Sequence, residues 1–296
     1  MNALILNPDS GPLTRNIEDY PGGIIIPIDK PYRWTSADVI RKIKFAAIRH
    51  FGKKNLKVGH AGTLDPLATG ILLVCIGNAT KLAEELQSHD KEYIAGISFG
   101  ATTPSYDLEK EIDRFFPHEH INSSAVEEAL PAFLGEQNQI APLFSAKSVD
   151  GVRAYELARK LYKSDGSLDE AARELIRVSR INITELELIE FTPADSEGLG
   201  NSPTLCGQGG STVPACAVTT ASSRINVTDN SALGLPRAVI RMSCSKGTYV
   251  RAFARDLGEA IGSGAHLDSL QRRRSGIFRI QEALTVEQAI QLLVSS

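Results

Sequence analysis

GHAGTLDPLATG, residues 59–70, runs directly into the apolar stretch ILLVCI, residues 71–76. Gly59 and Gly62 flank His60 and Ala61, which permits tight turns and a close approach of the backbone. Pro66 restricts Asp65 to an extended conformation and removes the next backbone donor. The apolar run predicts a buried strand, so Asp65 is expected on a loop beside a rigid strand, where catalytic side chains often lie. A structural alternative stays open here, an Asx-type turn in which Asp65 bonds its own backbone.

The composition is that of a soluble globular protein. The 296 residues are 42% hydrophobic and 23% charged, enough for one large domain or two ordinary ones. No apolar run reaches the roughly 18 residues of a membrane-spanning helix, and the N-terminus lacks the basic start of a secretory signal. The four cysteines form no Cys-x-x-Cys pair, which argues against a zinc site. The cytoplasm is therefore the expected compartment.

The charge pattern allows a nucleic-acid partner only if basic residues are clustered. The net charge is −3, whereas RNA affinity comes largely from neutralisation of phosphates by Lys and Arg. Two clusters predict a basic cleft around Asp65, although each could also be a solvated face. The first cluster comprises Arg41, Lys42, Lys44, Arg49, Lys53, Lys54 and Lys57, and the second comprises Arg272, Arg273, Arg274 and Arg279.

Strands and helices alternate irregularly along the chain, which favours a mixed α+β fold. Apolar and alternating patterns predict strands at residues 23–28, 70–76, 91–99, 238–243 and 277–280, and one or two within 176–191. Helical spacing predicts helices at Ser36–His50, capped by Ser36, and at residues 122–134, 153–162 and 248–261. A short helix is expected after Asn78 or Thr80, and a last helix, capped by Thr285, to about Val294. Residues 1–21 and 137–151 are expected to be irregular, and residues 193–236, rich in Gly, Ser, Thr, Pro and Asn, to form a flexible insertion.

The segment 59–70 resembles the signature of the TruB family, the tRNA pseudouridine-55 synthases, with Ala61 where the usual pattern has Thr. The resemblance covers about residues 22–192 and 237–290. Further blocks agree in the family's order: Asp29-Lys30-Pro31 with Trp34-Thr35-Ser36, Asp90-Lys91-Glu92-Tyr93, Ser145-Ala146-Lys147 with Gly151, Arg153-Ala154-Tyr155-Glu156 and Ala158-Arg159, Cys244-Ser245-Lys246-Gly247-Thr248-Tyr249-Val250-Arg251, and Gly264-Ala265-His266-Leu267 with Leu270 and Arg274-Ser275-Gly276.

The resemblance implies the pseudouridine synthase fold, an α+β fold whose mixed, mainly antiparallel central sheet is flanked by helices. One catalytic domain is expected over residues 22–296 after the irregular lead-in of residues 1–21. A thumb-like RNA-binding insertion is expected at about 137–165. The insertion at about 193–236 has no counterpart in the family pattern.

Several departures from the family pattern concern RNA binding. Phe144 stands where the family often has Tyr, and Gln271 and Arg273 replace commoner residues. Because the chain ends at Ser296, soon after the last predicted helix, the C-terminal RNA-binding PUA domain of many relatives is expected to be absent. The expected absence of this domain bears on RNA affinity more than on chemistry.

The activity implied by the resemblance is isomerisation of the T-loop uridine of tRNA, uridine-55, to pseudouridine. The reaction breaks the N1–C1′ bond, turns the uracil and rejoins it through C5, so neither a cofactor nor a metal is expected. Asp65 would be the catalytic carboxylate. It could attack C6 or C1′, or deprotonate the 2′ position, and the sequence leaves all three routes open.

The same resemblance implies roles for residues around Asp65. Arg251 would pair with Asp65 and favour its ionised form. Tyr93 would stack on the uracil and help remove the C5 proton. Tyr249 would line the pocket, with Leu270 in its wall. The structural alternatives are a surface charge for Arg251, a half-buried strand aromatic for Tyr93 and a core residue for Tyr249.

RNA binding is expected to involve base flipping, because the target uridine lies in a folded loop. By resemblance, His60 would fill the gap that the flipped base leaves, although a histidine between glycines could instead bond the backbone in a turn. Lys30, Lys147 and Arg153 are expected phosphate contacts. The expected partner is tRNA, with no membrane, no obligate protein partner and a monomeric state.

Other functions are considered beside this one. A guide-dependent pseudouridine synthase of the dyskerin type shares the Asp motif but normally carries the PUA domain. A catalytically silent tRNA-binding folding chaperone would not need Asp65, Tyr93 and Arg251 together. A hydrolase acting on glycosidic bonds usually needs a pair of carboxylates, and no second acid stands out. The sequence therefore favours the tRNA pseudouridine synthase.

Overall fold

The structure is a computed structural model that describes residues 2–142, 144, 148–149, 152–153, 178–195 and 225–294. The chain divides into two units. The first contains Met1–Tyr93, Val213–Ile225 and Gln271–Ser296, and the second contains Ile94–Thr212 and Asn226–Leu270. Strands β5 (Lys91–Phe99) and β13 (Ala265–Ser275) have residues in both.

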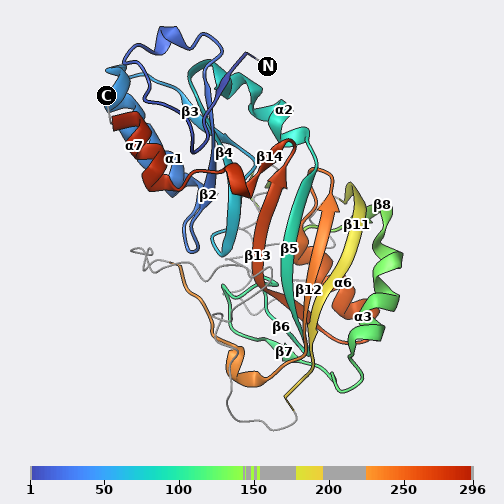
Figure 1. The fold of residues 1–296 in the computed structure, drawn as a ribbon. Coiled ribbons are helices and arrows are strands. Elements are labelled where there is room, and N and C mark those ends of the chain that lie inside the picture. The colour runs from blue at the N-terminus through green and yellow to red at the C-terminus, as the bar shows by residue number, and fades with distance from the viewer. Residues whose placement is uncertain are drawn as a thin grey trace. The chain divides into compact units, whose positions relative to one another are not determined.

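The sheet of the first unit is built around β4 (Ala68–Ile76), which lies between β2 (Ile24–Lys30) and the last residues of β13 (Figure 1). Strands β2 and β4 are antiparallel, and their register pairs Ile24 with Ile76 and Lys30 with Gly70. This register brings Lys30 beside Gly70, at the end of the loop that carries Asp65. Shorter strands complete the sheet: β1 (Leu4–Ile5) parallel to β2, β3 (Val58–Ala61) antiparallel to β4, and β14 (Phe278–Arg279) antiparallel to β13.

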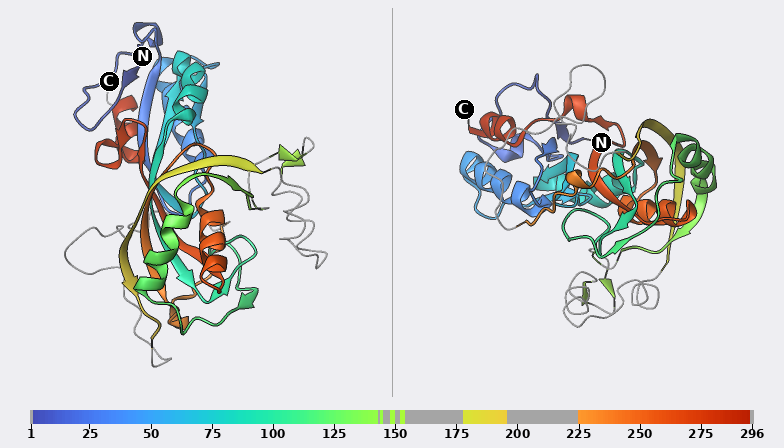
Figure 2. Two further views of the ribbon diagram at one scale, coloured as in Figure 1. Left: turned by 90° about the vertical axis from the view of Figure 1, so that its right-hand side faces the viewer. Right: turned by 90° about the horizontal axis from the view of Figure 1, so that it is seen from below.

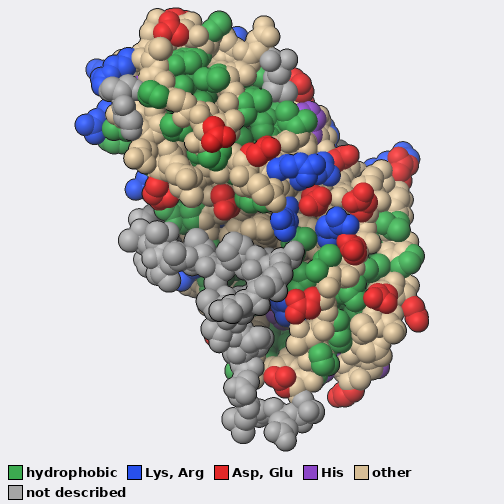
Figure 3. Space-filling model, in the orientation of Figure 1, with side chains coloured by type: hydrophobic (Ala, Val, Ile, Leu, Met, Phe, Trp, Pro, Cys, Tyr) green, Lys and Arg blue, Asp and Glu red, His purple; other side chains and the backbone are tan. Residues whose placement is uncertain are grey.

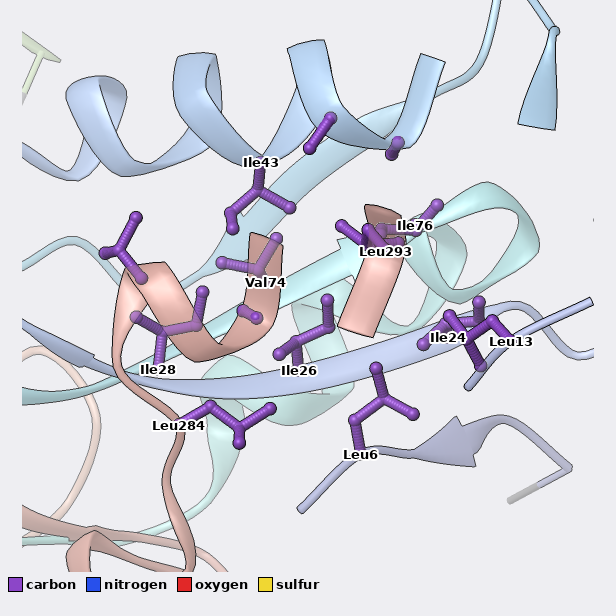
Figure 4. Close-up of a cluster of buried hydrophobic side chains, with 14 of the residues drawn as sticks. Leu6, Leu13, Ile24, Ile26, Ile28, Ile43, Val74, Ile76, Leu284 and Leu293 are labelled. Carbon is purple, nitrogen blue, oxygen red and sulfur yellow. The ribbon is translucent and has the colours of Figure 1, made fainter. Parts of the chain in front are cut away.

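Both faces of β2 and β4 are buried, which explains why their sequences are continuously apolar. Alternate residues face opposite sides of a sheet. One side packs against α1 (Ser36–Phe51) and α7 (Val286–Val294), as Figure 4 shows, and the other against α2 (Ala83–Ser88). Each fully buried Ile or Leu side chain contributes about 1.5–3 kcal/mol. The first side buries Ile24, Ile26, Ile28, Ile43, Val74 and Leu293, and the second buries Ile25, Ile71, Leu73 and Leu86.

Helix α1 begins with a capping box at Thr35, one residue before the predicted cap. The Thr35 Oγ1 accepts a hydrogen bond from the Asp38 amide at 3.0 Å, and the Thr35 amide donates to the Asp38 carboxylate at 3.0 Å. The prediction that Ser36 caps the helix is wrong, because the Ser36 hydroxyl is buried and bonds to Leu64. The helix ends at Gly52, whose φ of 62° is left-handed.

The sheet of the second unit has the strand order β13, β5, β12 (Arg237–Cys244), β11 (Ser179–Thr192) and β8 (Gly135–Gln139). Strand β11 is antiparallel to both of its neighbours. Helices α3 (Ser123–Ala129) and α6 (Val250–Ala260) lie side by side against one face of these strands (Figures 1 and 2). Phe133 of η3 (Leu130–Phe133) meets Phe253 of α6 edge to face, with ring centroids 5.3 Å apart. These packed helices and mainly antiparallel strands confirm the predicted α+β class.

The remaining elements are short. Two small antiparallel pairs are β6 (Ala101–Thr102) with β7 (Arg114–Phe115), and β9 (Ser148–Val149) with β10 (Val152–Arg153). The 3-10 helices besides η3 are η1 (Ile17–Asp19), η2 (Gly77–Leu82), η4 (Ser231–Leu233) and η5 (Ile280–Glu282). Strand β1 and helix η1 fall within residues 1–21, which the sequence predicts as irregular.

Most predicted elements agree with the structure, and two differences stand out. Residues 137–151 are not irregular throughout, because β8 extends to Gln139. The eleven-residue strand β13 was not predicted, because its run of Gln and Arg residues lacks the apolar or alternating pattern of a strand. The predicted helix at 153–162 is wrong at its first residue, because Arg153 lies in β10. The rest of that helix, most of the thumb and residues 196–224 of the insertion lie outside the described residues.

An ion pair crosses the sheet of the second unit where a glycine makes room for it. Arg237 of β12 makes a two-pronged contact with Asp268 of β13, at 2.6 and 2.8 Å. The Ser98 hydroxyl of β5 donates to the same carboxylate at 2.9 Å. A Cβ added at Gly96 would lie 2.2 Å from Arg237 Nη2 and 2.3 Å from Asp268 Oδ1. Any side chain at position 96 would therefore displace the pair.

We predict that Gly96→Ala lowers the free energy of unfolding by about 1–3 kcal/mol, the usual cost of overpacking a filled site. Urea unfolding followed by circular dichroism measures the change. The matched control is Gly11→Ala, since a Cβ at Gly11 meets nothing within 4 Å. Equal stability of the two variants would contradict the packing described for the Arg237–Asp268 pair.

Candidate active site

Asp65 lies in a tight turn at the entrance to β4. The Ala68 amide donates to the Asp65 carbonyl at 3.1 Å, and Pro66 occupies the first central position, which suits its fixed φ. The backbone of Asp65 thus closes the turn, and Asp65 is half-buried. Glycines with left-handed φ flank the turn, Gly62 at 88° and Gly70 at 98°. Gly62 and Gly70 are therefore required by the backbone conformation, whereas Gly59 is not in a left-handed conformation.

Ser36 fixes the residue before Asp65. Its hydroxyl donates to the Leu64 carbonyl at 3.1 Å and accepts from the Leu64 amide at 3.0 Å. Both groups of one loop residue are thus satisfied by a single buried side chain at the start of α1. The first turn of the helix and the Asp65 loop are held in one geometry.

Lys30, at the end of β2, holds the residue after Asp65. Lys30 is 0% exposed, and its ammonium donates to the carbonyls of Pro31 at 3.0 Å, Trp34 at 2.6 Å and Pro66 at 3.2 Å. Burial lowers the pKa of Lys30 to about 7, and the negative charge of Asp65 acts in the opposite direction. Such complete burial does not fit the expected phosphate contact, because the ammonium faces loop carbonyls instead of solvent.

Arg272, in β13, holds the start of the loop. Only 2% of the residue is exposed. Its Nε donates to the Ile71 carbonyl at 2.7 Å, Nη2 to the Gly62 carbonyl at 3.0 Å, and Nη1 lies 3.5 Å from the Thr63 carbonyl. A Cβ at Gly70 would lie 2.2 Å from the Arg272 carbonyl oxygen, so only glycine permits this approach.

The second basic cluster is thus less open to RNA than the sequence predicts. Arg272 is buried against the loop, and Arg274 lies 3.8 Å from the Glu92 carboxylate and donates to the Gly276 carbonyl at 3.3 Å. Arg273 is half-buried and Arg279 is exposed. A strand alternates its side chains between two faces, so the run cannot present all of its charges to one partner.

His60 lies in β3, shortly before the loop. The residue is half-buried, its Nδ1 is buried, and no hydrogen-bond partner for this atom lies among the described residues. Burial, followed by the positive charge of Arg272, lowers the pKa of His60 below its usual value. The imidazole is therefore neutral at neutral pH, a form suited to stacking on a base.

Arg251 is a buried residue of α6 in the second unit. Its Nη1 donates to the Ser105 carbonyl at 3.1 Å, its Nη2 donates to the Phe144 carbonyl at 2.8 Å, and Nη1 lies 3.5 Å from the Asp107 carboxylate. This burial rules out the alternative of a surface helix charge. Its pairing with Asp65, a residue of the first unit, stays a prediction.

Asp107 is a buried acid that the sequence analysis did not identify. Its Oδ1 accepts from the Ser105 hydroxyl at 2.6 Å and from the Glu109 amide at 3.0 Å. The Thr103 hydroxyl donates to the Asp107 carbonyl at 2.7 Å. An acid bonding the amide two residues on is an Asx turn, the local signal by which sequence could have found it.

Tyr249 is half-buried and immediately precedes α6. The buried Gln139 side chain accepts from the Tyr249 amide at 2.8 Å and donates to its carbonyl at 3.1 Å. This reciprocal pair fixes the backbone from which the ring extends. No sequence pattern revealed Gln139, because it comes from β8, far away along the chain.

The other expected site residues have less defined positions. Tyr93 is buried in β5, and Leu270 is half-buried in β13. Lys147 lies outside the described residues, and Arg153 is described only as backbone of β10. Their expected roles stay predictions.

The described part of the chain contains neither a metal-binding cluster nor a membrane helix. Within residues 2–142, 178–195, 225–294 and the shorter described pieces, no group of three His, Cys, Asp or Glu side chains could hold a metal ion. In the same part of the chain, no helix is both long and apolar enough to cross a membrane.

Comparison with protein families and curated relatives identifies the family. Residues 49–198 match the family model of the TruB family pseudouridylate synthase N-terminal domain. A tRNA pseudouridine synthase B from Phocaeicola vulgatus is 45% identical over 91% of this chain and 92% of the relative. One of the same name from Bacteroides thetaiotaomicron is 43% identical over the same shares of the two chains.

Solved structures with a similar fold include a chain of an H/ACA RNP bound to a substrate RNA containing 2′-deoxyuridine, with a TM-score of 0.52 and 20% identity. A chain of a Cbf5-Nop10-Gar1 complex has a TM-score of 0.52 and 23% identity. The matches cover 95% and 92% of this chain but only 57% and 55% of those chains, and they support the fold alone. On the strength of the family match and the curated relatives, the chain belongs to the TruB family of pseudouridylate synthases.

Proposed function

We propose that this protein isomerises a uridine of tRNA to pseudouridine, and that its target is the T-loop uridine, uridine-55. The curated relatives with 45% and 43% identity, each matched over 92% of its length, are named for tRNA, which favours tRNA over a guide-dependent substrate. The observation that carries the chemistry is the Asp65 turn, whose backbone is held from three sides by buried polar side chains.

The loop geometry supports Asp65 as the catalytic carboxylate. During the reaction the N1–C1′ bond breaks, the uracil turns, a C5–C1′ bond forms, the C5 proton leaves and N1 takes up a proton, so the product is an isomer of the substrate. A carboxylate acts best when it does not have to reorganise as charge develops. Ser36, Lys30 and Arg272 supply that preorganisation, since they hold the residues before and after Asp65.

Arg251 is proposed to orient Asp65 and to keep it ionised, and Asp107 to hold Arg251. Tyr93 would stack on the uracil and assist removal of the C5 proton, with Tyr249 and Leu270 lining the pocket. The Gln139 side chain supports the position of Tyr249 by binding its backbone on both sides. The buried Arg251 guanidinium, held by the buried Asp107 carboxylate, is a suitable partner for the charge on Asp65 that changes during catalysis.

His60 is proposed to fill the gap that the flipped base leaves. Its lowered pKa favours a neutral ring, which can stack without bringing an extra positive charge into the loop. Lys147 and Arg153, in the proposed thumb at about 137–165, stay proposed phosphate contacts. The catalytic domain is proposed to span residues 22–296, with an insertion at about 193–236. We further propose that the enzyme acts as a cytoplasmic monomer without an obligate protein partner.

Asp65→Asn is expected to abolish the reaction while leaving tRNA binding intact, because the amide is neither a nucleophile nor a base. The assay measures tritium released from a tRNA transcript carrying 5-tritiated uridine, with the modified site mapped to the T-loop. We expect a loss of at least about a thousandfold, equivalent to about 4 kcal/mol. Equal release by both proteins would contradict the role of Asp65, and product outside the T-loop would contradict the substrate.

Arg272→Lys is expected to slow the chemical step, because an ammonium keeps the charge but cannot span the carbonyls of Gly62, Thr63 and Ile71. A loop displaced by a fraction of an ångström to an ångström costs about 10–100-fold in rate. Single-turnover tritium release at saturating tRNA measures this rate, and filter binding measures the dissociation constant.

The control for Arg272 is Arg273→Lys, a neighbouring half-buried arginine that has no hydrogen bond or ion pair recorded among the described residues. The control variant should retain the wild-type rate. If Arg272→Lys also retains it, the loop does not depend on the guanidinium.

A further inference from the structure

The first unit carries a lysine-lined hollow beside β3 that none of the proposed roles uses. It is open to solvent, with a volume of about 530 Å³. Its lining comes from α1, from the turn that follows α1, from β3 and from η2. The side chains relevant here are those of Lys44, Lys54, Asn55, Lys57 and Thr80, and the backbone of Gly59 forms part of the wall.

The hollow is positively charged. Three of its lining residues are lysines, and the lining contains no Asp or Glu. Lys44, Lys54 and Lys57 are exposed, and in the described part of the chain no carboxylate pairs with them. Lys53, which does not line the hollow, is paired with Glu18 at 2.8 Å. The three lysines are thus available to an anionic ligand.

The backbone that presents these lysines is fixed. Gly52 ends α1 in a left-handed conformation, and the Leu56 amide donates to the Lys53 carbonyl at 3.1 Å. Leu56 is buried in the core under α1, which anchors the turn. The Gly77 amide donates to the Lys57 carbonyl at 2.8 Å. A preordered backbone reduces the ordering cost of binding.

The hollow reaches β3, the strand that carries His60. Gly59 forms part of its wall, and His60 is the next residue. A strand rises about 3.3 Å per residue, so Lys57 lies about 10 Å along β3 from His60. A Cβ added at Gly59 would meet only Thr80, at 4.0 Å, so the wall there is open. A ligand in the hollow could therefore belong to the same RNA strand that His60 contacts.

We propose that this hollow binds backbone phosphates of the substrate RNA, next to the nucleotide whose base is flipped; the inference rests on the proposed function. Lysine ammoniums contact phosphates without reading sequence, so the hollow would position the RNA. It also accounts for RNA binding at a net charge of −3, since the charge is locally concentrated where it is needed. In Figure 3, Lys and Arg side chains gather at one edge of the unit that holds α1.

The test is tRNA binding by a protein in which Lys44, Lys54 and Lys57 are all changed to Gln. Binding is measured by filter binding in an Asp65→Asn background, so that turnover does not interfere, and at several salt concentrations. We expect the dissociation constant to rise at least about tenfold, and the slope of its logarithm against log salt to fall by about 2–3, given about 0.7–0.9 per phosphate contact.

The matched control removes the same charge from the same cluster outside the hollow, by Lys42→Gln, Arg49→Gln and Lys53→Gln. This variant should bind tRNA within about threefold of the parent protein. Thermal melts check that both triple variants are folded. Equal weakening by the two triple variants would show a general charge effect and overturn the site.

Three further outcomes separate the possible sources of failure. Inorganic phosphate that binds to the wild type but not to the hollow variant, while both bind tRNA equally well, would indicate a small-anion site and contradict the RNA assignment. Tritium release by the wild type, with unchanged binding by the hollow variant, would overturn the hollow and leave the proposed function intact. Binding lost in the hollow variant, with no tritium release by the wild type, would support the hollow and overturn the proposed function.

Discussion

The site depends on one constraint, the fixed backbone of the Asp65 loop. Ser36 bonds both backbone groups of Leu64, the Lys30 ammonium binds the Pro66 carbonyl, and the Arg272 guanidinium binds carbonyls at both ends of the loop. Burying charged side chains is costly unless they are hydrogen-bonded, and here both Lys30 and Arg272 donate to backbone carbonyls of the loop. The sheet and helices of the first unit serve to place these three side chains.

The same buried charges set the electrostatics of the loop. Lys30 and Arg272 donate to carbonyls of the turn that carries Asp65. The positive charge of Arg272 also contributes to the lowered pKa of His60. The lysines that we propose to contact RNA are instead Lys44 in α1 and Lys54 and Lys57 between α1 and β3. The cations that hold the Asp65 loop, Lys30 and Arg272, are therefore different residues from the lysines that we propose to bind the phosphate backbone.

Sequence reasoning predicted what is local and periodic, and missed what depends on contacts between distant segments. The apolar runs revealed β2, β4 and β5, and the glycine spacing revealed the turn around Asp65. Arg272 was expected among RNA-facing residues because nothing in a run of arginines shows which one points inward. Ser36 was expected to cap a helix, since the serine that binds Leu64 and the serine that caps a helix have the same local pattern. Gln139 carried no signal at all.

The central claim is that the Asp65 loop is rigid before RNA binds. The most direct test is amide hydrogen exchange in the free protein at Leu64, Ala68 and Gly70, whose amides bond Ser36 Oγ, the Asp65 carbonyl and the Asp29 carboxylate. We predict that these three amides are protected to the same extent as the interior amides of β4. Exchange as fast as that of exposed loop amides would contradict the account, because the loop would then have to be ordered by the substrate.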